Sequence, residues 1–208
     1  MTSTMKKLLS LSALLPLAGL LACGGGGGGG GTSAPATATS LSYTNPTSGT
    51  YLLMKDPASS GSHLVLDLVG PTTGTASGVT LTLNADTTKV TWTNVASTDP
   101  ANTLVENGTQ LNLGSAAPYI LLARTYGTTT LMATAAQKGV GSNDPPPALL
   151  NGVLLKVALD LKPNLGLASG TSISLSADGT KSWVLDDTVK TGNAISPITV
   201  TVGTLAAQ

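Results

Sequence analysis

The chemistry available to this sequence is limited by one histidine and one cysteine. His63 and Cys23 are the single residues of their types in a chain of 208, so one chain cannot assemble a zinc cluster, a CxxC redox centre or a Cys/His catalytic pair. A serine triad would need His63 beside a carboxylate such as Asp67. Four residues of strand separate these two side chains by about 13 Å, which is beyond hydrogen-bond reach. No GxSxG motif is present, and we expect no enzymatic activity.

Asp178, Asp186 and Asp187 are the residues best placed to hold a cation. They flank one predicted hairpin, so their carboxylates could converge on a hard cation such as Ca²⁺. Their spacing differs from that of an EF-hand loop. Asp178 also suits the turn itself, and the other two suit a polar strand end. We expect no metal site and no cofactor, and these three residues are the candidates for a metal site if there is one.

A carbohydrate-binding surface would need two or three exposed aromatic rings in a row to stack on sugar rings. The chain has two Trp, four Tyr and no Phe. Trp92 and Trp183 each share a strand face with aliphatic residues, so both are predicted to fill the core. Tyr119 and Tyr126 are therefore the candidates for contact with a ligand.

Charge and length narrow the class of protein further. Ten Lys and Arg balance ten Asp and Glu, and charged residues make up 10% of the chain. This composition offers no basic stripe to neutralise phosphates, which excludes nucleic-acid binding by counterion release. The length fits one domain with a short appendage, and the hydrophobic fraction of 41% is sufficient for a core.

Residues 1–22 are typical of a secretory signal peptide. Lys6 and Lys7 precede an apolar run from Leu8 to Ala22. The run is shorter than the roughly 20 residues that a transmembrane helix needs, so we expect the segment to be removed. Met5 stands directly before the lysines and is an alternative start to Met1.

The apolar run ends in Leu20-Leu21-Ala22-Cys23, which resembles the bacterial lipobox. The resemblance implies that Cys23 becomes an acylated mature N-terminus, and two or more acyl chains hold a protein firmly to a membrane. The next residue is Gly24, not the Asp that commonly signals inner-membrane retention in such lipoproteins. The resemblance therefore implies attachment to the outer membrane, with the periplasmic and surface-facing sides both open.

Residues 23–47 are predicted to be a linker. Gly24 to Gly31 is an unbroken glycine run followed by small uncharged residues, and such a stretch cannot bury enough apolar surface to offset its chain entropy. A flexible coil of about 20 residues spans about 25 Å. A phosphate-binding glycine loop is disfavoured because no strand precedes the run and no Lys-Ser/Thr follows it. Residues 48–208 then form the folded domain.

The rest of the chain alternates between apolar and polar residues in short runs separated by turn residues, as strands do. The clearest run, 152–161, places Val153, Leu155, Val157, Leu159 and Leu161 on one face. No window outside the signal keeps a helical period. The pattern predicts an all-β fold, an antiparallel jelly-roll or immunoglobulin-like β-sandwich of about nine strands. The predicted strands are 63–69, 79–83, 89–93, 119–125, 128–134, 152–161, 171–176, 182–185 and 198–202.

The order of these segments resembles the cohesin-type domain and its relatives among bacterial surface modules. The resemblance rests on HLVLDLVG, GVTLTLNADTTKVTWTNV, YILLARTYGTTTLMATAA, LLNGVLLKVALDLKP, GTSISLSADGTKSWVL and ITVTVGTL. It covers about residues 48 to 205 and implies a nine-stranded jelly-roll that holds another molecule. It assigns no contact residue, since a fold alone does not determine function.

Together these features predict a lipid-anchored envelope lipoprotein that presents a non-enzymatic β-sandwich. Its expected partners are the membrane, through Cys23, and another envelope or secreted protein. A carbohydrate-binding module and a passive structural lipoprotein are the alternatives. Sheet faces rich in Thr and Ser with few charges predict binding that depends weakly on salt.

Overall fold

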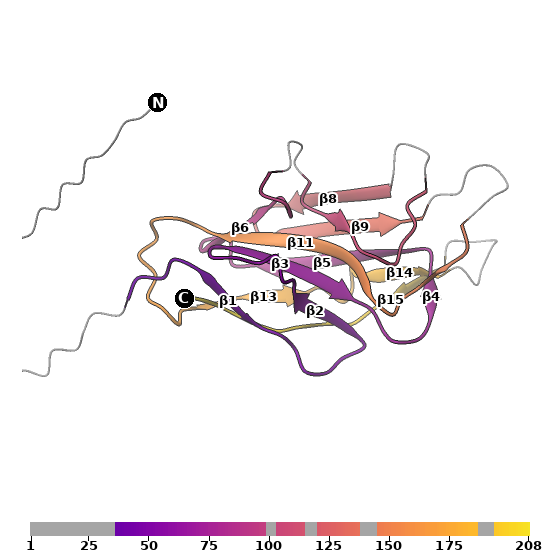
Figure 1. The fold of residues 1–208 in the computed structure, drawn as a ribbon, viewed down its shortest axis with the longest axis horizontal. Coiled ribbons are helices and arrows are strands. Elements are labelled where there is room, and N and C mark those ends of the chain that lie inside the picture. The colour runs from indigo at the N-terminus through magenta and orange to yellow at the C-terminus, as the bar shows by residue number, and fades with distance from the viewer. Residues whose placement is uncertain (1–35, 99–102, 115–119, 138–144, 187–193) are drawn as a thin grey trace, which may run out of the picture. The chain divides into compact units, whose positions relative to one another are not determined.

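The computed structural model describes residues 36–98, 103–114, 120–137, 145–186 and 194–208. In these residues the chain forms seventeen strands and no helix (Figure 1), which confirms the predicted all-β fold. The contacts divide the chain into residues 1–34 and a compact unit of residues 35–208. No helix in the described part is long and apolar enough to cross a membrane. The predicted signal peptide and Cys23 lie outside the described residues.

The first sheet has the strand order β16-β2-β3-β11-β6, and the short β7 pairs with β11 beside β6. All its pairs are antiparallel except β16 with β2, which is parallel. The predicted antiparallel arrangement is wrong at that pair, because the chain crosses over from the other sheet to the free edge of β2. The strands are β2 (Tyr51–Lys55), β3 (His63–Val69), β6 (Val90–Thr93), β7 (Glu106–Asn107), β11 (Val153–Leu161) and β16 (Val200–Val202).

The second sheet has the strand order β15-β14-β5-β9-β8, and β13 also pairs with β5. Every pair in it is antiparallel. Figure 1 shows β8 at the border of this sheet, beside β9. The strands are β5 (Gly78–Ala85), β8 (Ile120–Tyr126), β9 (Thr130–Ala136), β13 (Leu175–Ala177), β14 (Trp183–Asp186) and β15 (Ala194–Pro197).

Two small sheets complete the described fold. One contains β1 (Leu41–Thr44), β17 (Thr204–Ala207) and β12 (Ser172–Ile173), and the other contains β4 (Thr75–Ala76) and β10 (Ala148–Leu149). Strand β1 lies in the stretch 23–47 that we assign to the linker from the sequence. It joins the folded unit because Leu41 and Tyr43 are buried and the strand pairs with β17 near the C-terminus.

The core lies between the inner faces of the two large sheets and follows the predicted alternation. Leu64, Leu66 and Leu68 of β3 are at most 1% exposed, and they belong to the same buried cluster as Leu81 of β5. Strand β11 departs from the alternation at its start, where a β-bulge lies between Val153 and Leu155. The bulge buries both Leu154 and Leu155 and leaves Val153 half-exposed. The prediction that Val153 shares the core face is therefore wrong.

Tyr43 links β1 to two other parts of the fold. Its buried hydroxyl donates a hydrogen bond to the Leu53 carbonyl at 2.8 Å and accepts one from the Gly203 N–H at 2.7 Å. Gly203 joins β16 to β17, where a Cβ atom would lie 1.9 Å from the Thr44 carbonyl oxygen. Only glycine permits this close approach, and the Tyr43 hydroxyl satisfies the amide that the approach buries.

Replacing Tyr43 with phenylalanine should cost about 1–3 kcal/mol of unfolding free energy, because the Gly203 amide and the Leu53 carbonyl each lose a buried partner. Urea denaturation of the full chain measures the loss. Tyr51→Phe is the matched control, since Tyr51 is equally buried at 7% exposure and its hydroxyl has no hydrogen bond within the described residues. Equal losses for the two variants would contradict this role of Tyr43.

Candidate functional site

The outer face of the second sheet carries four large apolar side chains that remain exposed. On β8, alternation turns Leu121 and Ala123 toward the core. The intervening Ile120, Leu122 and Tyr126 are 41%, 53% and 53% exposed. At the opposite end of the sheet, Ile195 of β15 is 54% exposed. The sequence predicts β8, but the apolar residues of this strand fall on both faces. Alternation alone therefore does not identify which face is exposed.

Strands β14 and β15 extend this apolar surface. Trp183 pairs across the strands with Pro197, and Leu185 pairs with Ile195. Both Trp183 and Leu185 are half-buried on the outer face, while Val184 between them is buried in the core. The prediction that Trp183 fills the core is wrong, because the register of β14 places the alternate residue inward.

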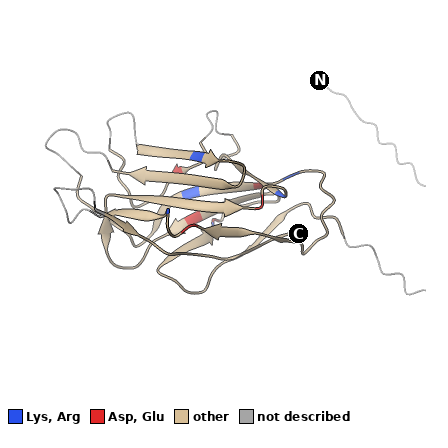
Figure 2. Cartoon of the chain, turned by 180° about the vertical axis from the view of Figure 1, so that it is seen from behind, with Lys and Arg blue, Asp and Glu red and all other residues tan. Residues whose placement is uncertain are grey.

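The centre of the same face is polar and neutral. The hydroxyls of Thr80 on β5 and Thr134 on β9 lie 2.9 Å apart in a hydrogen bond, and Thr130 donates to the Asn84 side-chain oxygen at 2.6 Å. Arg124 is the one charged residue on the outer face among the described strand positions. Figure 2 shows how sparsely charged residues are distributed over the described ribbon. We call this surface the apolar face, and it consists of Ile120, Leu122, Tyr126, Met132, Trp183, Leu185 and Ile195.

His63 lies on the other large sheet, and its partner is Asp160, not Asp67. The two residues are cross-strand neighbours on β3 and β11. The Nδ1 atom of His63 is 2.6 Å from a carboxylate oxygen of Asp160, and the Nε2 atom is 2.9 Å from the Val95 carbonyl oxygen. Both ring nitrogens are thus engaged by structural partners. Asp160 lies 97 residues away in the sequence, and no local motif indicates it.

Asp67 belongs instead to an ion cluster on the outer face of the first sheet. The Lys156 ammonium contacts Asp56 directly and lies 3.7 Å from Asp67 Oδ1, which is buried without a hydrogen-bond partner. Burial, followed by the neighbouring Asp56 carboxyl, raises the pKa of Asp67 to about 6. Burial alone would raise the pKa of Asp56 as well, but hydrogen bonds from Lys156 and the Ala58 amide lower it overall. The cluster is therefore held by one lysine.

In the described part of the chain, the candidate cation ligands Asp178 and Asp186 do not belong to a group of metal-ligating side chains. Asp178 caps its own turn: its Oδ1 accepts hydrogen bonds from the Thr180 amide at 3.0 Å and the Thr180 hydroxyl at 2.7 Å. Its other oxygen is 3.3 Å from the Lys181 ammonium. Asp186 ends β14, and Asp187 lies outside the described residues. Among the described side chains, no three His, Cys, Asp or Glu residues are grouped as metal ligands.

Of the two candidate tyrosines, Tyr126 is exposed and Tyr119 lies outside the described residues. Trp92 is 8% exposed and packs in the core, as predicted. Its indole N–H donates to the Thr129 carbonyl at 3.3 Å. It borders an open cavity of about 640 Å³ whose lining includes Leu104, Thr125 and Lys162. So little exposed ring offers no face on which a sugar could stack.

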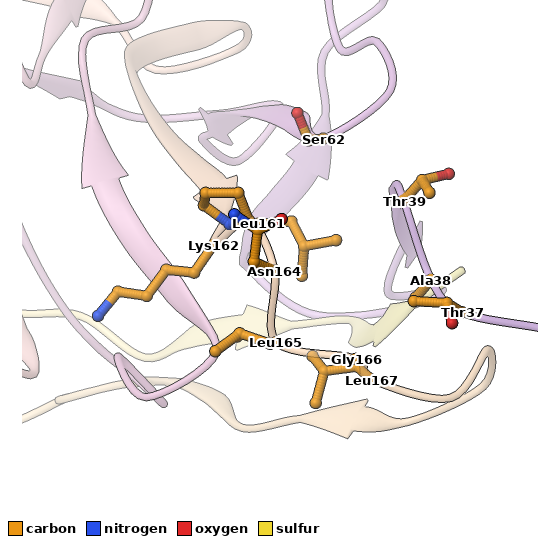
Figure 3. Close-up of a pocket in the computed structure, with 11 residues that line it drawn as sticks. Thr37, Ala38, Thr39, Ser62, Leu161, Lys162, Asn164, Leu165, Gly166 and Leu167 are labelled. Carbon is orange, nitrogen blue, oxygen red and sulfur yellow. The ribbon is translucent and has the colours of Figure 1, made fainter.

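A second cavity, of about 330 Å³, lies between Thr37–Thr39 and the turn after β11. Asn164 in this turn has a φ of 61°. Lys162 is the one ionisable residue in the lining, and Figure 3 shows its side chain directed away from Thr37 and Thr39. Among the described lining residues, the cavity therefore brings no pair of titratable groups together.

No known protein family matches this chain. No curated protein matches it either. Several solved structures are similar to it. A chain from the crystal structure of a CaDoc0917 variant in complex with CaCohA2 is 14% identical with a TM-score of 0.46, over 70% of this chain and 88% of that one. CaCohA2 from Clostridium acetobutylicum is 12% identical with a TM-score of 0.44, over 81% and 90%.

The sixth cohesin from scaffoldin B of Acetivibrio cellulolyticus, solved in complex with a mutant Cel5 dockerin, is 17% identical with a TM-score of 0.44, over 75% of this chain and 97% of that one. Cohesin domains are thus among the solved structures to which this chain is similar, as the resemblance noted in the sequence implies. Identities of 12–17% assign no role to any residue of this chain.

Proposed function

We propose that this protein is a lipid-anchored lipoprotein of the bacterial outer membrane whose β-sandwich binds another protein through the apolar face. The observation that carries the proposal is the exposure of Ile120, Leu122, Tyr126 and Ile195 on one face of one sheet. Three of these side chains, Ile120, Leu122 and Tyr126, lie together on β8, and an exposed apolar patch of this kind marks an interaction surface. Protein interfaces are also poor in charge at their centres, and Arg124 is the one charged residue among the described strand positions of this face.

A non-enzymatic role fits the arrangement of the titratable groups. The His63 ring has both nitrogens hydrogen-bonded to structural partners, so it has no free lone pair to act as a base. The buried carboxylates Asp56 and Asp67 are engaged with Lys156 away from either cavity lining. We therefore propose a binding protein.

The binding surface is tested with two leucines that are matched in type and exposure. Leu122 on the apolar face is 53% exposed, and Leu149 on β10 is 56% exposed. A photo-crosslinking residue at each position of the full chain, in the organism that encodes it, should give a discrete protein adduct at 122 and none at 149. With the partner identified, Leu122→Glu should raise Kd at least tenfold and Leu149→Glu less than twofold. Both should keep the wild-type melting temperature, because both side chains are already in water.

Three outcomes separate the proposal from its alternatives. Equal adducts or equal changes in Kd at the two leucines would place the interface elsewhere. Because Arg124 is the one charged residue among the described strand positions of this face, Kd should change little with ionic strength, and a steep salt dependence would contradict the apolar surface. Saturable binding to a glycan array that is lost in Tyr126→Ala would favour the carbohydrate-binding module.

The lipid anchor is tested separately at Cys23. Wild-type cells grown with a palmitate analogue should label the chain and retain it in the outer-membrane fraction, because several acyl chains hold it to the bilayer. Cys23→Ser should abolish the label and release the chain from that fraction. A variant that still incorporates label and stays with the membrane would exclude anchoring through Cys23, whatever the result for the binding face.

A further inference from the structure

The ring of His63 has a hydrogen-bond acceptor at each nitrogen. Nδ1 lies 2.6 Å from an Asp160 carboxylate oxygen, and Nε2 lies 2.9 Å from the Val95 carbonyl oxygen. A carboxylate and a carbonyl offer only lone pairs, so each ring nitrogen must supply a proton. A neutral imidazole has one N–H and would direct its remaining lone pair at an oxygen. The geometry therefore selects the imidazolium form.

This ring connects three segments that are distant in sequence. His63 begins β3, Asp160 lies opposite it on β11, and Val95 belongs to residues 94–98, which follow β6. The Val95 side chain is 7% exposed and packs on Val65 and Ala158, in a small apolar cluster separate from the main core. Residues 94–98 thus cover this part of the outer face of the first sheet, and the His63 ring holds their backbone there.

The charged surroundings favour the same form. Asp160 is the charged group within hydrogen-bond reach of the ring among the described residues. Farther along the same outer face are Asp67 on β3, Lys156 on β11 with its partner Asp56, and Glu106 on β7. The described residues of β6 and of 94–98 carry no charged side chain. Burial alone would lower the pKa of His63, but Asp160 and the Val95 carbonyl raise it overall.

We propose that protonated His63 is a pH-dependent clamp that holds Val95, and with it residues 94–98, on the outer face of the first sheet. A histidine whose pKa is raised by folding stabilises the folded form fully below its unfolded value of about 6.5. That stabilisation is lost as the pH rises through the folded value. The segment then loosens as the pH rises through that folded value and uncovers Val65 and Ala158. The clamp is independent of the proposed binding function, because it lies on the other large sheet.

A single histidine makes the titration unambiguous. The C2–H resonance of His63 in the full chain should give a pKa above 6.5, and the ¹⁵N shifts below that pKa should report protons on both ring nitrogens. Hydrogen exchange of residues 94–98, corrected for the intrinsic pH dependence, should rise about tenfold through the same midpoint, the change expected from the loss of one charge-assisted hydrogen bond. Amides in the middle of β11 should show no such step.

Variants assign the effect to the clamp. His63→Gln should remove the step and leave residues 94–98 in fast exchange at every pH, and Asp160→Asn should lower the His63 pKa. Asp178→Asn, which removes a carboxylate from a distant turn, should change neither. A His63 pKa at or below 6.5, or exchange at 94–98 that shows no step, would overturn the proposal. The wild-type titration alone decides the matter if a variant fails to fold.

Discussion

Replacing Val157 with aspartate is expected to lower the melting temperature of the full chain by at least about 8 °C. Val157 lies in the middle of β11 with its side chain 0% exposed between the two sheets. The substitution buries a carboxylate without a partner, at a cost of about 4 kcal/mol or more, and each kcal/mol is worth about 2–4 °C in a domain of this size. Thermal melts followed by circular dichroism measure the loss.

Val153→Asp is the matched control, because it places the same charge on the same strand. Plain alternation would put Val153 on the core face, but the β-bulge leaves it half-exposed. We expect its melting temperature to fall by less than about 4 °C, since a half-exposed carboxylate keeps its water. Equal losses at the two positions would show that the bulge is misplaced. No loss at Val157 would show that the register of β11 is wrong.

The central strands could be predicted because their signal is local. In β3, leucines alternate with other residues over seven positions, and β5 and β11 show similar patterns, so the period of two is visible without knowledge of the partner strands. The alternation in β3 places Leu64, Leu66 and Leu68 on one face, and all three are buried in the core. The predicted runs 128–134 and 182–185 overlap β9 and β14 with bounds displaced by one or two residues.

The elements that were missed depend on distant partners. Strands β1 and β17 have four residues each and pair with one another although they are far apart in the sequence. Small residues of β17, such as Ala206 and Ala207, carry no strand signal of their own. The bulge in β11 is likewise set by pairing with β3, not by the local pattern. Short strands of this kind are specified by tertiary context.

The sequence also indicated only part of the candidate site, because the rest of it depends on contacts between distant residues. Tyr126 was proposed for ligand contact and is exposed, but the aliphatic residues around it were not identified, because β8 is apolar on both faces. The pairs His63–Asp160 and Lys156–Asp56 join residues 97 and 100 positions apart. Such contacts follow from strand order, which a single sequence does not display.

The second large effect is expected for Lys156→Met at neutral pH. Methionine keeps the length of the apolar stem and removes the ammonium group, which leaves the carboxylates of Asp56 and Asp67, whose side chains are 6% and 12% exposed, without a counter-ion. Breaking a buried ion pair in this way costs about 3 kcal/mol. Urea denaturation at pH 7.5 should show that loss. Lys181→Met removes an exposed lysine paired with Asp178 and should leave the free energy of unfolding almost unchanged.

The loss should depend on pH in a defined direction. The pKa of Asp67 is about 6 in the folded protein, above its unfolded value of about 3.9. Its protonated form is therefore favoured by folding, and that stabilisation disappears as the pH rises through about 6. Without the lysine the pKa of Asp67 should rise further and the lowered pKa of Asp56 should rise as well, so the deficit of Lys156→Met should shrink as the pH falls from 7.5 to 4.5. Adding Asp67→Asn should recover part of the loss at pH 7.5, because it removes one of the two negative charges that repel one another. A deficit that is the same at both pH values and is unaffected by Asp67→Asn would mean that Lys156 stabilises the sheet by packing and not by charge.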